Sequence, residues 1–205
     1  IYYINLSQDD FNFGGSSFAQ TLNTIGNEVP TIKDAAFFKR AFNTIQELIL
    51  ENNILAGHDI GSGGLITTLL EMCFADVNLG AKIDFSVFEE KDIIKYLFAE
   101  NIGIVFQAKS DAEVESKLNA NTVSFYKLGT ATNEATLDFG PCTLDIAKYR
   151  DVWYKTSFLL DQKQSKNGTA QARFDNYKNQ ALNYTFPVKK KKKKPVIDAS
   201  QPRPK

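Results

Sequence analysis

The chain has 205 residues, with 43% apolar and 23% charged side chains, which is the composition of an ordinary globular protein rather than of a disordered or collagen-like chain. Its 24 basic residues balance its 24 acidic residues, so the net charge does not indicate a general nucleic-acid binder. Two cysteines are too few for a disulfide framework, one histidine argues against a Cys/His zinc site, and no run approaches the ~20 apolar residues of a membrane span.

The two ends of the chain differ from its body. Residues 1–6 predict a strand with neither an initial Met nor a signal peptide, as expected of a sequence cut from within a longer protein. After Pro187 come six consecutive lysines, Lys189–Lys194, and then several prolines. This segment cannot bury a core, and it lacks the aromatic residues that would favour RNA binding. We therefore expect one domain over residues 1–186 and a flexible linker over 187–205.

Helices and strands alternate in the first half. Ser16 or Ser17 is placed to cap a short helix that runs to about Thr24, and Gly26 is expected to end it. A capping box over 31–34 predicts the start of a long helix that ends near residue 52. A short apolar run at 54–56 precedes a glycine-rich loop over 57–64, which leads directly into another helix. The expected buried faces of these two helices are Phe38, Ala41, Phe42, Ile45, Leu48 and Ile49 in the first, and Ile66, Leu69, Leu70 and Cys73 in the second.

The second half predicts a strand over 81–87, a helix over 89–99 and a strand over 102–108, whose almost continuous apolar character favours the centre of a sheet. A capping box over 110–113 opens a helix to about 119, and a strand follows over 122–128. Residues 136–139 and 143–146 predict a hairpin around Gly140-Pro141. A long helix begins near Tyr149, and a more polar helix is expected over 169–182.

This order of elements predicts an α/β (α+β) fold in which helices cover a mixed β-sheet. The predicted core contains large apolar residues from most of these elements. They are Phe38, Phe42, Ile45, Leu69, Leu70, Leu97, Ile104, Phe106, Val123, Phe125, Trp153 and Leu159.

The segment from Gly57 to Gly64 carries the strongest indication of a ligand site. Four glycines in eight residues allow a tight turn and a close approach of the backbone to a ligand, and the helix that follows offers unpaired amides to a phosphate. Asp59 lies inside this segment, where a carboxylate beside phosphate is useful chiefly as a Mg²⁺ ligand. The pattern is neither a Walker A loop nor a dinucleotide fingerprint. From these residues alone, an ordinary turn in which Asp59 is a capping residue remains an open alternative.

Other candidates for chemistry have ordinary structural explanations. His58 is the single histidine, and such a residue is more often hydrogen-bonded structure than a catalyst. Ser62 lies in Gly-Ser-Gly but not in the nucleophile elbow of hydrolases, and Cys73 is expected on an apolar helix face. A second glycine turn, residues 13–17, either caps a helix or touches a phosphate. We therefore expect no catalytic residue in this chain.

Four segments, in the same order and spacing, resemble the phosphoribosylformylglycinamidine synthases. FGGSSFAQ at 13–20 resembles their LGGSALAQ segment, GHDIGSGGL at 57–65 is similar to GHDRSDGGL, and the stretch from Leu69 to Ala75 also fits. Residues 151–157, DVWYKTS, look like their xIWxxTSY motif. The resemblance covers about residues 1–180.

The resemblance implies a fold like the C-terminal domain of aminoimidazole ribonucleotide synthetase, in the second of two tandem units. It implies a cytoplasmic purine-biosynthesis ligase that uses ATP, Mg²⁺ and glutamine to convert formylglycinamide ribonucleotide to formylglycinamidine ribonucleotide. The missing subdomains and the glutaminase domain of the same polypeptide would be its partners, with neither nucleic acid nor membrane among them. This chain would be inactive alone, and this half of the family's enzyme would hold an auxiliary nucleotide, ATP or ADP.

In the family pattern the Asp after His binds Mg²⁺, which carries over to Asp59, and the following turn, Gly61, Ser62, Gly63 and Gly64, would contact the nucleotide. Two positions depart from the pattern. Gly61 replaces a Ser that contacts nucleotide, so any contact there must come from the backbone, and Ser62 replaces an Asp. Two alternatives stay open: another ATP-binding member of the same fold, such as a small-molecule kinase or maturation protein, or a non-enzymatic binding module with a basic tail.

Overall fold

The computed structural model of the chain describes residues 1–179, and the strands in this range form two sheets of four. The chain divides into two compact units, Ile1–Ser157 and a second that begins at Phe158. The predicted domain boundary at 186/187 and the predicted linker over 187–205 lie outside the described residues.

The first sheet has the order β2-β4-β1-β5, with every pair of neighbours antiparallel. Its strands are β1 (Tyr2–Asn5), β2 (Ile54–Asp59), β4 (Gly103–Ala108) and β5 (Tyr126–Lys127). Strand β4 pairs with β2 on one side and with β1 on the other. The prediction that residues 102–108 form a central strand is therefore confirmed.

The second sheet has the order β6-β3-β7-β8. Its strands are β3 (Gly80–Ile83), β6 (Gly129–Thr132), β7 (Thr136–Asp138) and β8 (Thr143–Asp145). Strands β3 and β7 run parallel and the other neighbours antiparallel, and β7 and β8 form the predicted hairpin. The mixed α/β fold class is confirmed, with its strands divided between two sheets.

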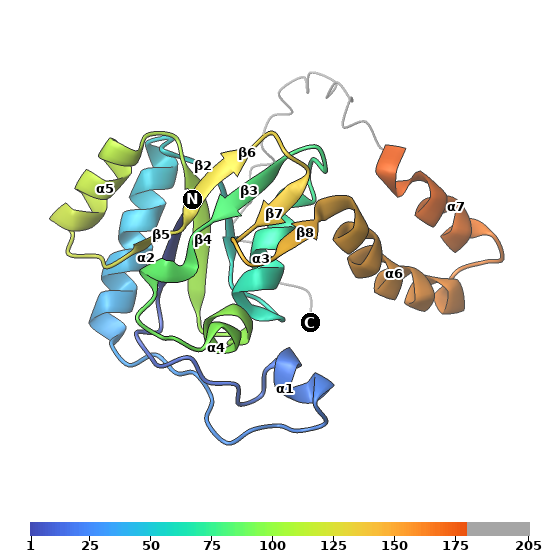
Figure 1. Ribbon diagram of the computed structural model, residues 1–205, viewed down its shortest axis with the longest axis horizontal. Coiled ribbons are helices and arrows are strands. Elements are labelled where there is room, and N and C mark those ends of the chain that lie inside the picture. The colour runs from blue at the N-terminus through green and yellow to red at the C-terminus, as the bar shows by residue number, and fades with distance from the viewer. Residues whose placement is uncertain (180–205) are drawn as a thin grey trace, which may run out of the picture. The chain divides into compact units, whose positions relative to one another are not determined.

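Helices cover both faces of the first sheet (Figure 1). The helices are α1 (Ser17–Thr21), α2 (Ala35–Leu50), α3 (Gly64–Cys73), α4 (Ile93–Phe98), α5 (Asp111–Ala120), α6 (Ile146–Gln164) and α7 (Thr169–Asn176), with 3₁₀ turns at Phe85–Val87 and Tyr177–Asn179. Helices α2 and α5 lie on one side of β1 and β4, and α3 and α4 lie on the other.

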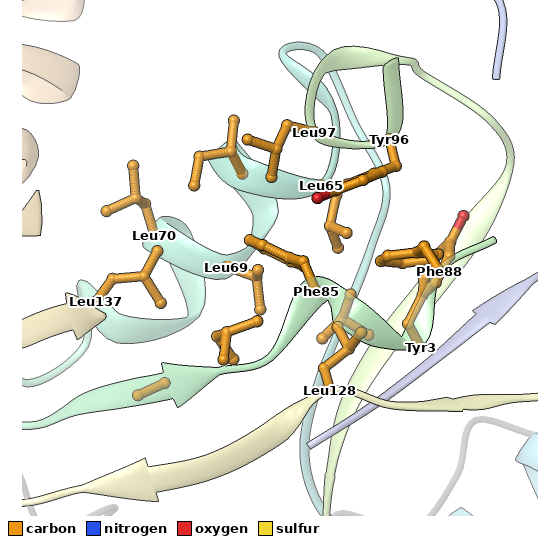
Figure 2. Close-up of a cluster of buried hydrophobic side chains, with 14 of the residues drawn as sticks. Tyr3, Leu65, Leu69, Leu70, Phe85, Phe88, Tyr96, Leu97, Leu128 and Leu137 are labelled. Atoms are coloured by element: carbon orange, nitrogen blue, oxygen red, sulfur yellow. The ribbon is translucent and has the colours of Figure 1, made fainter. Parts of the chain in front are cut away.

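The side chains of β1 and β4 alternate between two cores. Tyr2 and Phe106 point toward α2 and α5, where their rings stack with centroids 5.5 Å apart. Tyr3 and Val105 point toward α3 and α4, into a second cluster that Figure 2 shows, with Leu65 and Leu69 of α3 beside Phe85 and Phe88. Because both faces are buried, these strands are apolar at nearly every position.

The predicted core is correct in part. Ile45, Leu69, Leu70, Leu97, Phe106 and Val123 are buried, and Phe38, Ile104 and Phe125 are half-buried against the core. Three predictions are wrong, because Phe42, Trp153 and Leu159 are 48%, 49% and 49% exposed. The buried residues of α2 are Phe37, Ala41, Thr44, Ile45 and Leu48, so its buried stripe is rotated away from Phe42 and Ile49. Thr44 can be buried because its hydroxyl donates to the carbonyl of Arg40 at 2.9 Å.

Helix α6 explains the other two errors. Ile146 is its buried residue, and the helix beyond its first turn keeps Trp153 and Leu159 half-exposed. An apolar spacing of three and four along a helix therefore did not indicate burial here. In the second unit, the rings of Phe158 and Phe174 lie 4.2 Å apart, and Arg173 pairs with Asp161.

Several element boundaries differ from those predicted. The cap of α2 is Asp34, not Thr31, because the Asp34 carboxylate accepts from the amides of Ala36 and Phe37 at 2.9 Å. Helix α1 ends at Thr21 rather than 24. The strand predicted over 81–87 turns into a 3₁₀ helix at Phe85, and the helix predicted from 89 begins at Ile93. Of the strand predicted over 122–128, only Tyr126–Lys127 (β5) is a strand in the structure. Strand β6 was not predicted.

Candidate functional site

The candidate site lies where strand β2 passes into helix α3. The expected loop over 57–64 is shorter than predicted, because residues 57–59 pair with residues 104–106 of β4 and belong to β2. Residues 60–63 form the turn, and α3 begins at Gly64. Asp59 is therefore the last residue of an edge strand, and the turn separates it from the N-terminus of α3.

Two glycines of this turn are required by its geometry. Gly63 and Gly64 have φ values of 91° and 74°, in the left-handed region that other residues rarely adopt. A Cβ atom on Gly64 would lie 2.6 Å from the carbonyl oxygen of Leu97 in α4. A Cβ atom on Gly61 would meet nothing within 4 Å, so the turn is open on that side.

The carboxylate of Asp59 extends away from the protein. Its side chain is 88% exposed, with Oδ1 lying 3.4 Å from Nδ1 of His58. Its backbone carbonyl is fixed instead, since it accepts from the Thr68 hydroxyl at 3.3 Å and lies 2.6 Å from the same His58 nitrogen. Residues 1–179 contain no group of three or more acidic, His or Cys side chains that could share a metal ion. A cation held by Asp59 would therefore need phosphate oxygens and water as its further ligands.

His58 is held from both sides of its ring. Nε2 lies 3.2 Å from a carboxylate oxygen of Glu71 in α3, while Nδ1 faces the carbonyl of Asp59. The other oxygen of Glu71 accepts from Trp153. These contacts fit the expected structural role of His58, which orients the end of β2.

The amides of the predicted nucleotide turn divide into two pairs. The Gly63 N–H donates to Oε1 of Glu100 at 2.8 Å, and the Gly64 N–H donates to the carbonyl of Gly61 at 3.1 Å. Within residues 1–179, no acceptor is assigned to the N–H groups of Gly61 and Ser62. Of the four predicted contact residues, Gly61 and Ser62 are thus the two whose amides are available to a ligand.

The second glycine turn lies beside the first. Ser16 caps α1, as predicted, by accepting from the amide of Ala19 at 3.1 Å. The residue after this cap, Ser17, donates its N–H at 2.8 Å to Oε1 of Glu100, the same atom that accepts from Gly63. The structure therefore brings the two glycine turns together on one carboxylate.

Sequence reasoning missed Glu100. One signal was present: Glu100 follows the C-terminus of α4 by two residues, where the helix dipole disfavours a negative charge. A carboxylate just after a helix C-terminus therefore suggests that hydrogen-bond donors from another part of the chain stabilise it. Its donors lie 83 and 37 residues away, and only the tertiary fold identifies them.

Cys73 has the environment of a structural residue. It is partly buried at the end of α3, and burial raises the pKa of its thiol. A raised pKa reduces the thiolate fraction at neutral pH, so the residue is a poor nucleophile.

Among residues 1–179, none of the helices is both long and apolar enough to cross a membrane.

Most of the chain matches a known protein family. Residues 7–140 match the family model described as AIR synthase related protein, C-terminal domain. This range contains both glycine turns, Asp59 and Glu100.

Two curated relatives are named for the same activity. One, from Arabidopsis thaliana, is named probable phosphoribosylformylglycinamidine synthase, chloroplastic/mitochondrial, and is 34% identical over 172 residues. The other, phosphoribosylformylglycinamidine synthase from Homo sapiens, is 30% identical over 181 residues. These alignments cover 80% and 81% of this chain but 12% and 13% of the relatives, so the chain spans about an eighth of their length.

A solved structure has the same fold. The structure described as T. maritima PurL complexed with FGAR aligns with a TM-score of 0.53 and 16% identity, over 73% of this chain and 27% of that one. At this identity the likeness concerns the fold alone.

Proposed function

We propose that this chain supplies one wall of a Mg²⁺-nucleotide site in a ligase of purine biosynthesis. The chain belongs to the family described as AIR synthase related protein, C-terminal domain. The whole protein would convert formylglycinamide ribonucleotide, ATP and glutamine to formylglycinamidine ribonucleotide, ADP, phosphate and glutamate. The names of the two long relatives support this reaction. The chain's share of it would be binding, since the described residues offer no nucleophile with a paired base.

The observation that carries the proposal is the pairing of an exposed carboxylate with an open turn. Asp59 projects from the end of β2, and in the next turn the N–H groups of Gly61 and Ser62 have no acceptor among residues 1–179, while a Cβ on Gly61 would meet open space. Backbone amides are good donors to phosphate oxygens. A carboxylate next to phosphate is repulsive unless a cation lies between them, so the set fits a phosphate bound as its Mg²⁺ complex.

In this proposal each residue has a distinct role. Asp59 would hold Mg²⁺ through its carboxylate, and the ion would offset the negative charge of the phosphates. Gly61 and Ser62 would donate backbone hydrogen bonds to a phosphate. Gly63 and Gly64 would shape the turn rather than contact the nucleotide, because their amides already bind within the chain.

The remaining parts of the reaction would lie outside this chain. We propose that other subdomains of the same polypeptide complete the nucleotide site and that a glutaminase domain supplies ammonia. The nucleotide held here, ATP or ADP, would be auxiliary, as the resemblance implies. Nucleic acid and membranes would not be partners.

The compartment is a separate proposal. We propose that the whole protein is located in the cytoplasm. The Arabidopsis relative is named as chloroplastic/mitochondrial. Microscopy of the whole protein fused to a fluorescent domain would decide between them. Signal confined to an organelle would contradict the proposal.

The direct test of the proposed function is a titration of the whole protein with Mg²⁺-ADP and Mg²⁺-ATP, together with a product assay. The proposal requires saturable Mg²⁺-dependent binding and formation of formylglycinamidine ribonucleotide. Phosphate transfer to a small molecule without use of glutamine would instead favour the kinase alternative. Absence of both nucleotide binding and turnover would favour a binding module.

A further inference from the structure

Glu100 lies where the two glycine turns of the candidate site meet. The residue is half-buried in the connection between α4 and β4, and its Oε1 atom accepts two backbone hydrogen bonds of 2.8 Å. One donor is Ser17, at the start of α1. The other is Gly63, the residue before α3. A single oxygen atom therefore sets the separation of the two turns.

The neighbouring residue holds a third loop. Asn101 is buried, and its Nδ2 atom donates to the carbonyls of Asp9 and Asp10 at 3.2 and 3.0 Å and to the hydroxyl of Ser7 at 3.0 Å. This fixes the backbone on which Glu100 is carried. Glu100 is consequently anchored by its own segment and is not free to follow a moving turn.

The packing around Glu100 supports the same convergence. The ring of Phe18, in α1, stacks on that of Phe98, in α4, with centroids 4.9 Å apart. Gly64 approaches the carbonyl of Leu97 so closely that a Cβ atom would lie 2.6 Å from it. Helices α1 and α3 are thus both packed against the end of α4, and the carboxylate fixes their amides at the point of contact.

We propose that Glu100 is a positioning residue of the nucleotide site, which sets the orientation of the turn at residues 61–64. By accepting the N–H of Gly63, it removes that amide from the ligand and fixes the peptides of Gly61 and Ser62, whose amides are left to meet the phosphate. This inference rests on the proposed nucleotide binding, but the hydrogen bonds themselves do not.

The role depends on an oxygen atom at the right distance rather than on charge. Glu100→Gln keeps the chain length and one carbonyl oxygen, which can accept both N–H groups. Glu100→Asp keeps the charge but is shorter by one methylene, so its oxygen falls short of at least one amide. Glu100→Ala removes the acceptor. Glu113, exposed in the first turn of α5, provides the matched control.

The experiment has two readouts, both made on the whole protein. Hydrogen exchange measured by mass spectrometry follows peptides that contain Ser17 and Gly63. We expect both amides to be protected in the wild type and in Glu100→Gln, and to exchange faster in Glu100→Asp and Glu100→Ala. The Kd for Mg²⁺-ADP should rise about tenfold in those two variants, equivalent to about 1.4 kcal/mol, and stay within about threefold in Glu100→Gln. Glu113→Asp and Glu113→Ala should change neither readout.

Three results would overturn the inference. A Kd that is unchanged in Glu100→Asp and Glu100→Ala, with only a lower Tm, would make Glu100 a purely structural residue. A tenfold tighter Kd in Glu100→Gln would show that the carboxylate competes with phosphate instead of positioning the turn. Equal exchange of the two amides in all variants would remove the geometric basis. If wild-type protein binds no nucleotide, the proposed function fails, and the exchange data still decide whether Glu100 holds both turns.

Discussion

Trp153 donates its indole N–H to the carboxylate of Glu71, with 2.7 Å between Nε1 and Oε1. The other oxygen of that carboxylate lies 3.2 Å from Nε2 of His58, one residue before Asp59. Helix α6 is thereby connected, through one side chain of α3, to the strand that ends at the candidate site. The tryptophan segment of the sequence thus supports the site from outside and does not fill the core.

This arrangement predicts a modest energetic role for Trp153. Trp153→Phe keeps a ring against Phe74, whose centroid is 5.6 Å away, and should lower the free energy of unfolding by about 0.5–1.5 kcal/mol through the lost hydrogen bond. Phe106→Ala, at a fully buried position, should cost about 3–5 kcal/mol. Urea unfolding measures both. Equal losses in the two variants would mean that Trp153 is a core residue after all.

Gly64 and Gly61 should differ in how well they tolerate substitution by alanine. Gly64→Ala should lower the free energy of unfolding by about 2 kcal/mol or more, because its φ is positive and the Cβ meets the Leu97 carbonyl. Gly61→Ala should stay within about 0.5 kcal/mol, since the added atom points into open space. Thermal and urea unfolding of the pair check this. A large loss in the Gly61 variant would contradict the open turn.

A charge cluster around Lys127 predicts how stability depends on pH. Lys127 pairs with Asp111 at 2.8 Å and Glu115 at 3.0 Å, and Tyr2 donates to Glu115 at 2.6 Å. The Lys127 ammonium holds the pKa of Asp111 below its usual 3.8, and the hydroxyl of Tyr2, followed by Lys127, holds that of Glu115 below 4.5. Carboxyl groups with lowered pKa stabilise the fold above their unfolded values and lose that stabilisation as the pH falls through the folded values.

We therefore expect Lys127→Met to reduce the loss of stability on acidification. The free energy of unfolding of the wild type should fall more between pH 7 and about pH 3 than that of the variant. Urea unfolding across this range measures the difference, with the exposed Lys109→Met as the control for a lost surface charge. Identical pH profiles for wild type and Lys127→Met would show that the cluster contributes nothing.

Much of the fold could be predicted because its signals are local. The turn at Gly140-Pro141 and the flanking alternation identified the β7–β8 hairpin, and the Ser110 cap identified the start of α5. Strand β6 and Glu100 were missed because their partners are distant in sequence. Residues of β6 pair with β3 across some fifty positions, and the oxygen of Glu100 joins two turns from different parts of the chain.

The sequence singled out a segment as a candidate site, but it did not show how the backbone hydrogen bonds of that segment are arranged. The glycine spacing indicated a turn between a strand and a helix, but the turn is confined to residues 60–63, with Asp59 at the end of β2 and Gly64 at the start of α3. The spacing did not show that the amide of Gly63 is already bonded, because its partner, Glu100, lies 37 residues away and meets it only in the folded chain. A helical pattern likewise predicted burial for Trp153, whereas α6 buries Ile146 in its first turn and leaves Trp153 49% exposed.

The chain by itself should not form product. Supplied with formylglycinamide ribonucleotide, Mg²⁺-ATP and glutamine, it should release no phosphate above background, since in the proposed function it supplies one wall of a nucleotide site, and since it spans about an eighth of its relatives' length. A coupled phosphate assay, with the whole protein as positive control, measures this. Turnover by the chain alone would contradict its assignment as part of an enzyme.

The most direct test of the account is the retention of nucleotide by the whole protein carrying Asp59→Asn, measured with and without Mg²⁺ beside the wild type and Glu113→Gln. The Asp59 side chain is 88% exposed, so the substitution should leave the Tm of the nucleotide-free protein unchanged. If Asp59 holds Mg²⁺ as proposed, loss of its carboxylate should weaken Mg²⁺-dependent binding by about tenfold or more, and nucleotide should no longer raise the Tm. Unchanged retention and an unchanged thermal shift would make Asp59 an ordinary residue at the end of a strand.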